Sequence, residues 1–354
     1  MRRSMRCTAL ALVLALGLTA CSDDDGQDAE ASSLLDTVID RGQVICGVND
    51  AVPGFGVATA DGSLEGFDID FCRAIAAAVF GDADAVEYVP LTAEARFTAL
   101  QSGEIDVLSR NTTWTATRDG GEGAAFVTTT FYDGQGMMVR SDSGIGSVDD
   151  MADTAVCVLS GTTTELNLEA QFSARGLNYD ALTFEDTDTL REAFIADRCD
   201  GWTSDLSQLA AIRSAWPDGE GGPEGLSILA DTLSKEPLGP AVRDGDSRWF
   251  DVVNWAIIAT IQAEEFGLTS ANVSGIAESV DPDTEPEVAR FLGVTDADPG
   301  LGLDPDFALN VVSQVGNYAE IFERNVGPDT GLGLERGLNA QWTDGGLLYA
   351  PPYR

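Results

Sequence analysis

Residues 66–77 read GFDIDFCRAIAA, and this short stretch decides the fold class of the chain. Gly66 permits a turn, Asp68 is placed to cap a helix, and Asp70 falls in the first helical turn. The apolar side chains that follow recur at helical spacing: Phe71, Ile75 and Val79. The apolar run at residues 43–48 predicts a strand before this helix. A strand that leads into a helix, repeated along the chain, predicts an α/β fold.

A second strand and helix follow, and they lead into a polar segment. Residues 92–101 predict a helix that ends at Gly103, and a strand begins at Ile105. Ligands of parallel α/β sheets bind beyond the carboxyl ends of the strands, where residues 49–55 and 111–118 would both lie. The candidate ligand-binding residues there are Asn49, Phe55, Asn111, Thr113, Trp114 and Arg118. Thr-rich stretches ending in Arg also occur in ordinary edge strands, and Phe55 and Trp114 suit a core equally well.

A second α/β unit follows residue 137. Residues 154–159 predict a strand, and Thr162 and Thr163 precede a helix at 166–175, so free backbone N–H groups there would face an anion. Thr162 suits a simple N-cap role equally well. A strand at 198–205 ends in Asp205 at the equivalent edge. The chain then returns through residues 237–242 to a helix marked by Trp249, Val253 and Ile257. Two crossings between the units predict a hinge.

The first 33 residues predict export. Three arginines, at positions 2, 3 and 6, precede an apolar run of about ten residues, which is too short to span a bilayer. We interpret residues 1–20 as a signal peptide. Leu-Thr-Ala-Cys21 resembles the bacterial lipoprotein box, which implies lipidation of Cys21; the alternative is an ordinary secretory signal. Residues 21–33 are acidic and polar, which predicts a flexible tether before a folded body at Leu34.

Composition narrows the classes of function. The formal net charge is −39, and −42 without the three arginines of the signal, so binding to nucleic acid is not expected. Lys235 is the one lysine, and this acidic surface suggests adaptation to salt. With no histidine, Ser-His-Asp triads and His-based metal sites are excluded. The acidic turn at 281–287 lacks the glycine of a calcium loop, so we predict no metal and no cofactor.

Four cysteines remain after Cys7 and Cys21 are set aside. An even number outside the cytoplasm favours two disulfides, and four cysteines allow three connectivities. Because two fall in each unit, we expect Cys46 to pair with Cys72 and Cys157 with Cys199. Buried free thiols are the alternative.

Residues 66–77 also resemble the signature of the bacterial extracellular solute-binding proteins of the polar amino-acid type. The resemblance runs from Leu34 to the C-terminus and is closest to the general L-amino-acid-binding branch. It rests on long segments: residues 97–115, 161–168, 234–240 and 337–352. It implies a two-lobed periplasmic-binding-protein type 2 (Venus flytrap) fold with a hinge. Lobe 1 would comprise residues 34–136 and 240–354, and lobe 2 residues 137–239.

This resemblance implies a clamp that closes on an L-amino acid and delivers it to an ABC transporter permease with its ATPase. Such a protein is expected to be a monomer, anchored through lipid on Cys21 at the outer face of the cell membrane or in the periplasm. The family's carboxylate-binding arginine falls on Arg118, and its neighbouring polar contacts fall on Asn111 and Thr113. The helix N-terminus from the second lobe falls on Thr162 and Thr163, and the acid for the α-ammonium falls on Asp205.

Two departures from the family pattern concern side-chain specificity. Many relatives have a small residue where this chain has Arg110, and Val52 stands where an aromatic is common. Arg110 either points away as a surface charge or reaches in and favours acidic or polar ligands.

Two other classes of protein are alternatives for this sequence. Some proteins of this fold are lyases acting on small carboxylates, such as cyclohexadienyl dehydratases, and would need a perturbed Glu in the cleft. The other class is a ligand-sensing module of a receptor or cell-wall enzyme.

Overall fold

A computed structural model describes residues 33–295 and 297–353. The predicted signal peptide, nearly all of the predicted tether and Cys21 lie outside the described residues. The chain from Ser33 onward forms one compact unit built around two main β-sheets.

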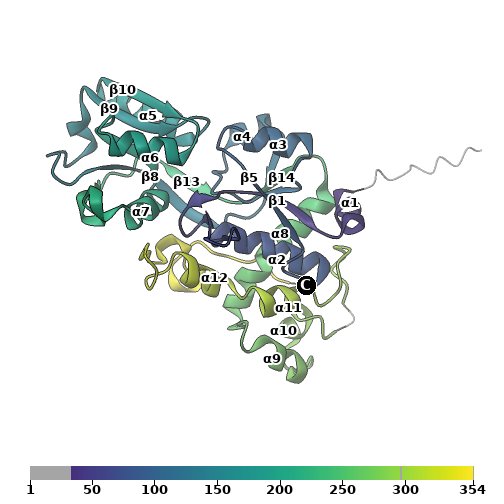
Figure 1. The fold of residues 1–354 in the computed structure, drawn as a ribbon. Helices are drawn as coiled ribbons and strands as arrows, with labels where there is room; N and C mark the ends of the chain where they lie inside the picture. Colours follow the sequence, from purple (N-terminus) through teal and green to yellow (C-terminus); the bar gives the residue numbers. More distant parts are fainter. Residues whose placement is uncertain (1–32, 296, 354) are drawn as a thin grey trace, which may run out of the picture. The chain divides into compact units, whose positions relative to one another are not determined.

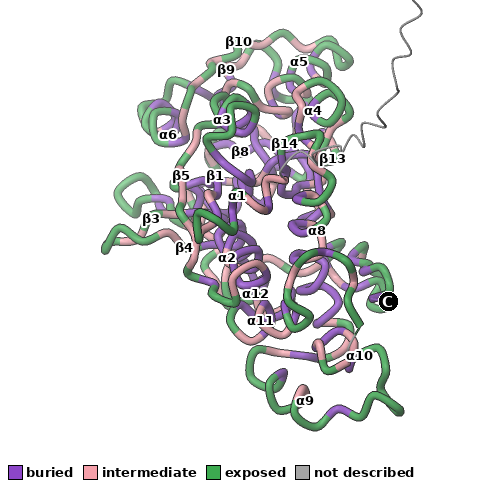
Figure 2. Tube along the Cα trace, turned by 90° about the vertical axis from the view of Figure 1, so that its right-hand side faces the viewer, coloured by how far each residue is buried: buried purple, intermediate pink, exposed green. Residues whose placement is uncertain are grey.

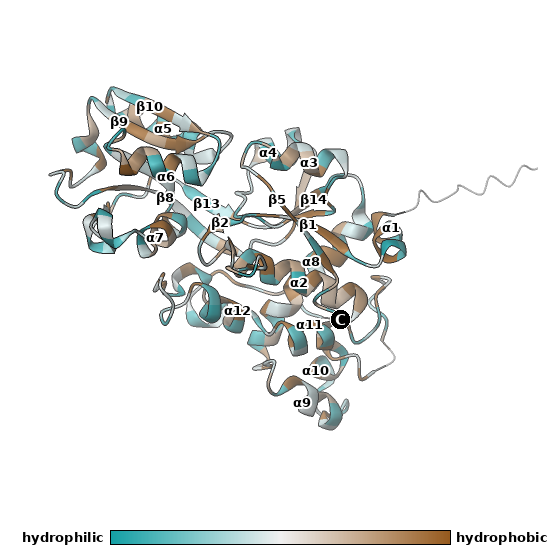
Figure 3. Ribbon diagram, viewed as in Figure 1, coloured by the Kyte–Doolittle hydropathy of each residue, from teal (hydrophilic) through white to brown (hydrophobic). Residues whose placement is uncertain are grey.

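The first sheet has five strands in the order β5-β1-β6-β14-β7 (Figure 1). Their bounds are Val86–Pro90 (β5), Val44–Val48 (β1), Val107–Leu108 (β6), Ala241–Arg243 (β14) and Ala124–Phe126 (β7). Strand β1 is parallel to β5 and β6, whereas β14 is antiparallel to β6 and β7. The late strand β14 thus completes a sheet made otherwise from the first third of the chain. Hydrophobic side chains dominate β1 and β14, as expected for strands covered on both faces (Figure 3).

Helices cover both faces of this sheet. One face packs against α2 (Phe67–Phe80) and α8 (Ser247–Glu265), and the other packs against α3 (Arg96–Ser102). Helices α1 (Leu34–Arg41) and α4 (Ala116–Gly121) complete this part.

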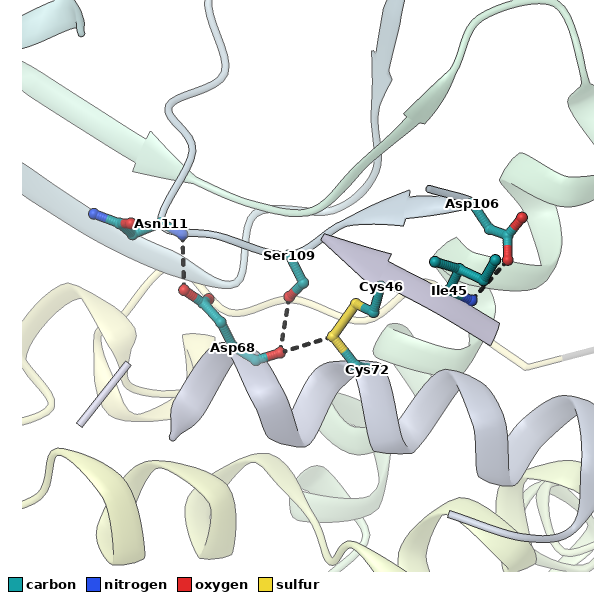
Figure 4. The surroundings of a disulfide bond; sticks show 7 residues. All are labelled: Ile45, Cys46, Asp68, Cys72, Asp106, Ser109 and Asn111. Atoms are coloured by element: carbon teal, nitrogen blue, oxygen red, sulfur yellow. Dashed lines mark hydrogen bonds between the residues drawn. A yellow bond between two sulfur atoms is a disulfide. The ribbon is translucent and has the colours of Figure 1, made fainter. Parts of the chain in front are cut away.

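Helix α2 corrects one detail of the sequence interpretation. Its N-cap is Gly66, which makes no side-chain cap, so Asp68 lies in the first turn and is not the cap. A side chain at Gly66 is excluded, because a Cβ there would lie 2.3 Å from the carbonyl oxygen of Phe55 and φ is 141°. The Asp68 carboxylate accepts a hydrogen bond from the backbone N–H of Asn111 (2.7 Å). The residue thus ties α2 to the end of the neighbouring strand (Figure 4).

The second sheet has the order β10-β9-β11-β8-β12, with β13 also paired to β8. The bounds are Tyr179–Phe184 (β10), Thr154–Leu159 (β9), Gly201–Asp205 (β11), Phe131–Arg140 (β8), Leu226–Ile228 (β12) and Lys235–Leu238 (β13). Side chains alternate across β9: Val156 and Val158 pack with α5 (Thr163–Arg175), while Cys157 and Leu159 face α6 (Thr187–Ile195) and α7 (Leu206–Ser214). The strand predicted at 154–159 is confirmed, and the helix after it begins at Thr163 instead of 166.

The chain passes between the two sheets twice, through residues 127–130 and 239–240. These crossings lie side by side, since Val127 N–H donates to the Pro240 carbonyl and Thr130 N–H donates to the Leu238 carbonyl. Strand β8 already starts at Phe131, and the lobe boundary drawn at residue 137 stays a prediction.

The remaining elements are a small sheet, the C-terminal helices and several short 3₁₀ helices. A small sheet is formed by Ala51–Val52 (β2), Gly56–Ala58 (β3) and Leu64–Glu65 (β4). The C-terminal helices are Val273–Ser279 (α9), Pro286–Phe291 (α10), Phe307–Gln314 (α11) and Tyr318–Asn325 (α12). Short 3₁₀ helices are Val148–Met151, Asp218–Glu220, Pro223–Gly225, Gly337–Asn339 and Trp342–Asp344. Helices α11 and α12 join the core of α2 and α8, whereas the tip of the β3–β4 hairpin is exposed (Figure 2).

Both predicted disulfides are present. Cys46 of β1 is bonded to Cys72 of α2, and Cys157 of β9 is bonded to Cys199, which precedes β11. Figure 4 shows the first bridge holding α2 under β1. Each bridge joins elements of one sheet and its own helices, so neither ties the first sheet to the second.

Candidate functional site

A small cavity lies where polar ends of elements from both sheets meet. It is lined by Ala93, Arg96, Arg110, Asn111, Thr113, Leu159, Thr162, Thr163, Thr164, Ser204, Asp205 and Gln208. Its volume is about 20 Å³, room for about one water molecule. The lining follows the carboxyl ends of β6, β9 and β11, which is where open α/β sheets bind ligands.

Two buried arginines converge on one carbonyl oxygen beside this cavity, and one of them, Arg96, also lines it. Nη2 of Arg96 and Nη2 of Arg118 both donate to the carbonyl oxygen of Gly161, each at 3.4 Å. Nη1 of Arg118 also donates to the Thr113 carbonyl (2.9 Å), and both guanidinium carbons lie 5.2 Å from the centre of the Phe97 ring. Burial lowers the pKa of both arginines, and the two charges also repel each other. In the part of the chain that the structure describes, neither forms an ion pair with a carboxylate. Two buried cations held this way can bind an anion.

Arg110 also reaches into the cavity, so it is not a surface charge. Only 6% of it is exposed, and its Nε donates to the Leu91 carbonyl at 2.7 Å. Its two terminal nitrogens make no hydrogen bond to any described residue. Burial lowers its pKa to about 10, so the group stays charged at neutral pH.

The start of α5 forms the wall from the second sheet. Thr162 is the N-cap: its Oγ1 accepts from the backbone N–H of Glu165 (3.1 Å). Oγ1 of Thr163 donates to buried Glu236 (2.8 Å) and lies 3.3 Å from Oγ1 of Thr113 on the opposite side. A helix of 13 residues thus directs its positive N-terminal end toward the same cavity as the arginines.

Asp205 supplies the carboxylate of the site. It ends β11, is 6% exposed, and accepts a hydrogen bond from Nδ2 of Asn111 (3.2 Å) across the cavity. Burial raises the pKa of Asp205, and the nearby carboxyls of Asp133 and Glu236 raise it further. A cation placed beside Asp205 would favour the charged carboxylate and so lower this pKa again.

Asn111 links the two sides of the cavity. Its Nδ2 also lies 3.2 Å from Oε1 of Gln208, and its Oδ1 accepts from Nδ2 of Asn49 (3.1 Å). The backbone there has φ 22°, a rare value for a residue with a side chain, and the bond from its N–H to Asp68 helps hold it.

Comparisons with known proteins identify the family of the chain. The profile of the family described as bacterial extracellular solute-binding proteins, family 3, matches residues 44–327. The chain belongs to this family. It is 49% identical to the general L-amino acid-binding periplasmic protein of Rhizobium johnstonii, over 97% of each chain. It is 47% identical to a glutamate/glutamine/aspartate/asparagine-binding protein of Rhodobacter capsulatus, over 92% of this chain and 95% of that one.

Solved structures show the same two-lobed periplasmic-binding-protein fold. A periplasmic binding protein of an ABC transporter from Brucella ovis, with glutathione bound, is 44% identical, covers 92% of this chain and all of that one, and has a TM-score of 0.87. An ancestral amino acid-binding protein described as a precursor of cyclohexadienyl dehydratase is 27% identical over 67% of this chain and 95% of that one, with a TM-score of 0.55. The two sheets are therefore the centres of the two lobes.

Among the predicted site residues of this solute-binding protein, two aromatics do not line the cavity. Phe55 is 1% exposed and packs edge-to-face on Phe67 and Phe131, so it is a core residue. Trp114 is 41% exposed and stacks on Phe126. Phe55 thus fits the core alternative, and Trp114 is not among the lining residues. Trp114 points away because neighbouring residues in an extended segment face opposite sides, and Thr113 faces the cavity.

Of the other predicted residues, six line the cavity: Arg110, Asn111, Thr113, Thr162, Thr163 and Asp205. Asn49 reaches it through Asn111, and Arg118 is not a lining residue but shares the Gly161 carbonyl with Arg96, which is. Sequence reasoning missed Arg96, Thr164, Ser204 and Gln208. Arg96 had a usable signal, because Ala93, Phe97 and Leu100 mark the buried face of the segment, and position 96 falls on that face. An arginine on a buried helix face indicates a functional or ion-pairing role.

No cluster of three or more His, Cys, Asp or Glu among residues 33–295 and 297–353 is arranged to hold a metal ion. Within the same ranges, no helix is both long and apolar enough to cross a membrane.

Proposed function

We propose that this chain is the substrate-binding component of an amino-acid ABC importer, which holds an L-amino acid between its lobes and delivers it to the permease. The observation that carries the proposal is the charge arrangement of the cavity. Buried Arg96 and Arg118, which form no ion pair with any described residue, meet at the Gly161 carbonyl next to the N-terminus of α5, and buried Asp205 supplies the carboxylate from the end of β11.

This arrangement suits the two charges that every free α-amino acid carries. The α-carboxylate would bind Arg118, with Arg96 and the start of α5 beside it, and the α-ammonium would bind Asp205. Both sites are buried, so water competes weakly and each charged hydrogen bond is stronger than at a surface.

Binding would require movement at the hinge. The cavity holds about one water molecule, whereas the smallest amino acid has five heavy atoms. The direct hydrogen bond between Asn111 and Asp205 would be replaced by bonds to the ligand. We propose that the lobes, residues 34–136 with 240–354 and residues 137–239, separate about the paired crossings at 127–130 and 239–240. A ligand that bonds both lobes then favours the closed form, which a permease can recognise.

We also propose the setting in which this occurs. The signal at residues 1–20 would direct export, and lipid on Cys21 would anchor a monomer at the outer face of the cell membrane or in the periplasm. The family's description as extracellular supports export.

Binding without catalysis is the better reading for this chain. A lyase of this fold is expected to have a glutamate with a perturbed pKa in the cleft, and no glutamate is among the residues that line the cavity. Glu236, the nearest buried glutamate at the start of α5, already accepts from Thr163, Asn167 and Ser234. Incubation with prephenate or arogenate should give no product, and turnover would support the lyase instead.

The glutathione-bound relative is compatible with the same head-group site. The γ-glutamyl end of glutathione carries a free α-amino group and a free α-carboxylate, as an amino acid does. Glutathione is therefore a second candidate ligand.

The function is tested by Arg118→Gln. Removing one partner of a buried charged contact costs about 2–5 kcal/mol, so we expect the Kd for L-glutamine to rise roughly 30-fold or more. Arg175→Gln is the matched control, since Arg175 lies in the last turn of α5 and pairs with exposed Asp149. Equal affinities of the two variants, measured by calorimetry, would refute the assignment.

A further inference from the structure

A second cavity of about 260 Å³ adjoins the small one. It is lined by residues 49–51 and 90–92 from the first lobe, by residues 185–188 from the second, and by Arg110 and Leu159. Arg110 and Leu159 line both cavities. The two spaces therefore meet at Arg110, and the larger one continues away from Asp205 and Arg118.

At the junction of the two cavities, the guanidinium of Arg110 has N–H groups that are free to donate hydrogen bonds. Only 6% of the residue is exposed, and its Nε donates a hydrogen bond to the Leu91 carbonyl. Its two terminal nitrogens have no acceptor among the described residues. A fixed guanidinium with free donors favours a carbonyl or carboxylate oxygen.

We propose that Arg110 binds the side-chain carbonyl of a glutamyl ligand, and that the adjoining cavity holds a substituent on that carbonyl. This inference rests on the proposed function, since it assumes that the α-groups occupy the small cavity. The ligand class is glutamine and γ-glutamyl amides, in which the α-amino and α-carboxyl groups stay free. A substituent of a few heavy atoms fits the volume of the second cavity.

The walls of the second cavity favour a neutral substituent over an anionic one. They carry four carboxylates, Asp50, Glu185, Asp186 and Asp188, against the single guanidinium. Asp186 caps α6 through the N–H of Thr189, and Asp188 pairs with Arg191. Asp50 and Glu185 are exposed and would repel a terminal carboxylate, so glutathione, whose glycine end is a carboxylate, should bind more weakly than a neutral γ-glutamyl amide.

Calorimetry on protein freed of ligand by unfolding and refolding tests the proposal with three probes: L-alanine, L-glutamine and γ-L-glutamylethylamide. We expect the ethylamide to bind within tenfold of glutamine. A weaker affinity than that, with alanine and glutamine both bound, overturns this inference and leaves the proposed function intact. If none of the three binds, the proposed function itself fails.

Two variants locate the subsite. Arg110→Met should lower the ratio of glutamine to alanine affinity by tenfold or more, because alanine has no side-chain acceptor. Ala51→Leu, which narrows only the second cavity, should lower the ratio of ethylamide to glutamine affinity by at least threefold. The proposal is contradicted if Arg110→Met leaves the glutamine-to-alanine ratio unchanged, or if Ala51→Leu leaves the ethylamide-to-glutamine ratio unchanged. A thermal melt of each variant verifies that it is folded.

Discussion

Asp68 is a buried acidic residue that holds the backbone of the site residue Asn111 in place. It lies under the polar end of β6, bonded to the N–H of Asn111, and burial raises its pKa to about 7. In the unfolded chain the same group has its ordinary pKa of 3.8. Between about pH 4 and pH 7 the folded state therefore binds more protons, so this group's contribution to stability falls as pH rises.

The variant Asp68→Asn tests this linkage. An amide keeps an oxygen that can accept from the Asn111 N–H, but it cannot ionise. The stability of the variant relative to the wild type should therefore increase as pH rises. We expect the difference in Tm, variant minus wild type, to become more positive by about 3 °C or more from pH 5 to pH 8. Scanning calorimetry at both pH values measures it. A difference that does not vary with pH would mean that Asp68 ionises normally.

Individual site residues could be predicted where they follow a strand end. Asp205 and Asn111 line the cavity because strand ends converge at one edge of each sheet, whereas Arg118 lies in α4 and shares the Gly161 carbonyl with Arg96. Phe55 could not be assigned, because an aromatic beside a strand end fits a pocket or a core equally, and its contacts with Phe67 and Phe131 depend on the tertiary fold. Ligand contact by any of these residues remains a proposal.

At the scale of elements, the disulfides stabilise each lobe separately. The Cys157–Cys199 bridge closes a sequence separation of 42 residues, and loop-closure entropy predicts about 4 kcal/mol for such a bridge. The double variant Cys157→Ala/Cys199→Ala should lose about 2–5 kcal/mol of unfolding free energy yet keep its amino-acid affinity within about threefold, since the bridge joins elements of one sheet. Urea denaturation and calorimetry measure the two effects. Large loss of affinity in a folded variant would show that the bridge positions the site.

Element types were predictable from hydrophobic periodicity, whereas several boundaries were not. Residues 154–159 alternate between two buried faces, and the strand was found at its full length. Helix α3 starts at Arg96, four residues after the predicted start, because Thr92 begins a turn in which its Oγ1 accepts from the N–H of Ala95. The cap of α2 was missed because a glycine with φ 141° leaves no side-chain signal for an N-cap.

For the whole molecule, the dominant property is charge. With 59 acidic against 20 basic residues, like charges repel across the surface, and added salt screens them. We expect Tm to rise by several degrees between 0.05 M and 1 M NaCl, and a Tm that is constant or falls would contradict adaptation to salt. Sodium sulfate at equal ionic strength is the comparison that separates screening from general salting-out.

The central claim is that the two lobes bind the two charges of a free L-amino acid. Calorimetry of ligand-free protein with L-glutamine, N-acetyl-L-glutamine and the α-amide of L-glutamine tests it most directly. The acetyl group removes the cation that Asp205 would bind, and the amide removes the anion that Arg118 and Arg96 would bind. The account predicts tight binding of L-glutamine and a loss of at least about 100-fold for each blocked compound. Equal binding of all three would contradict it.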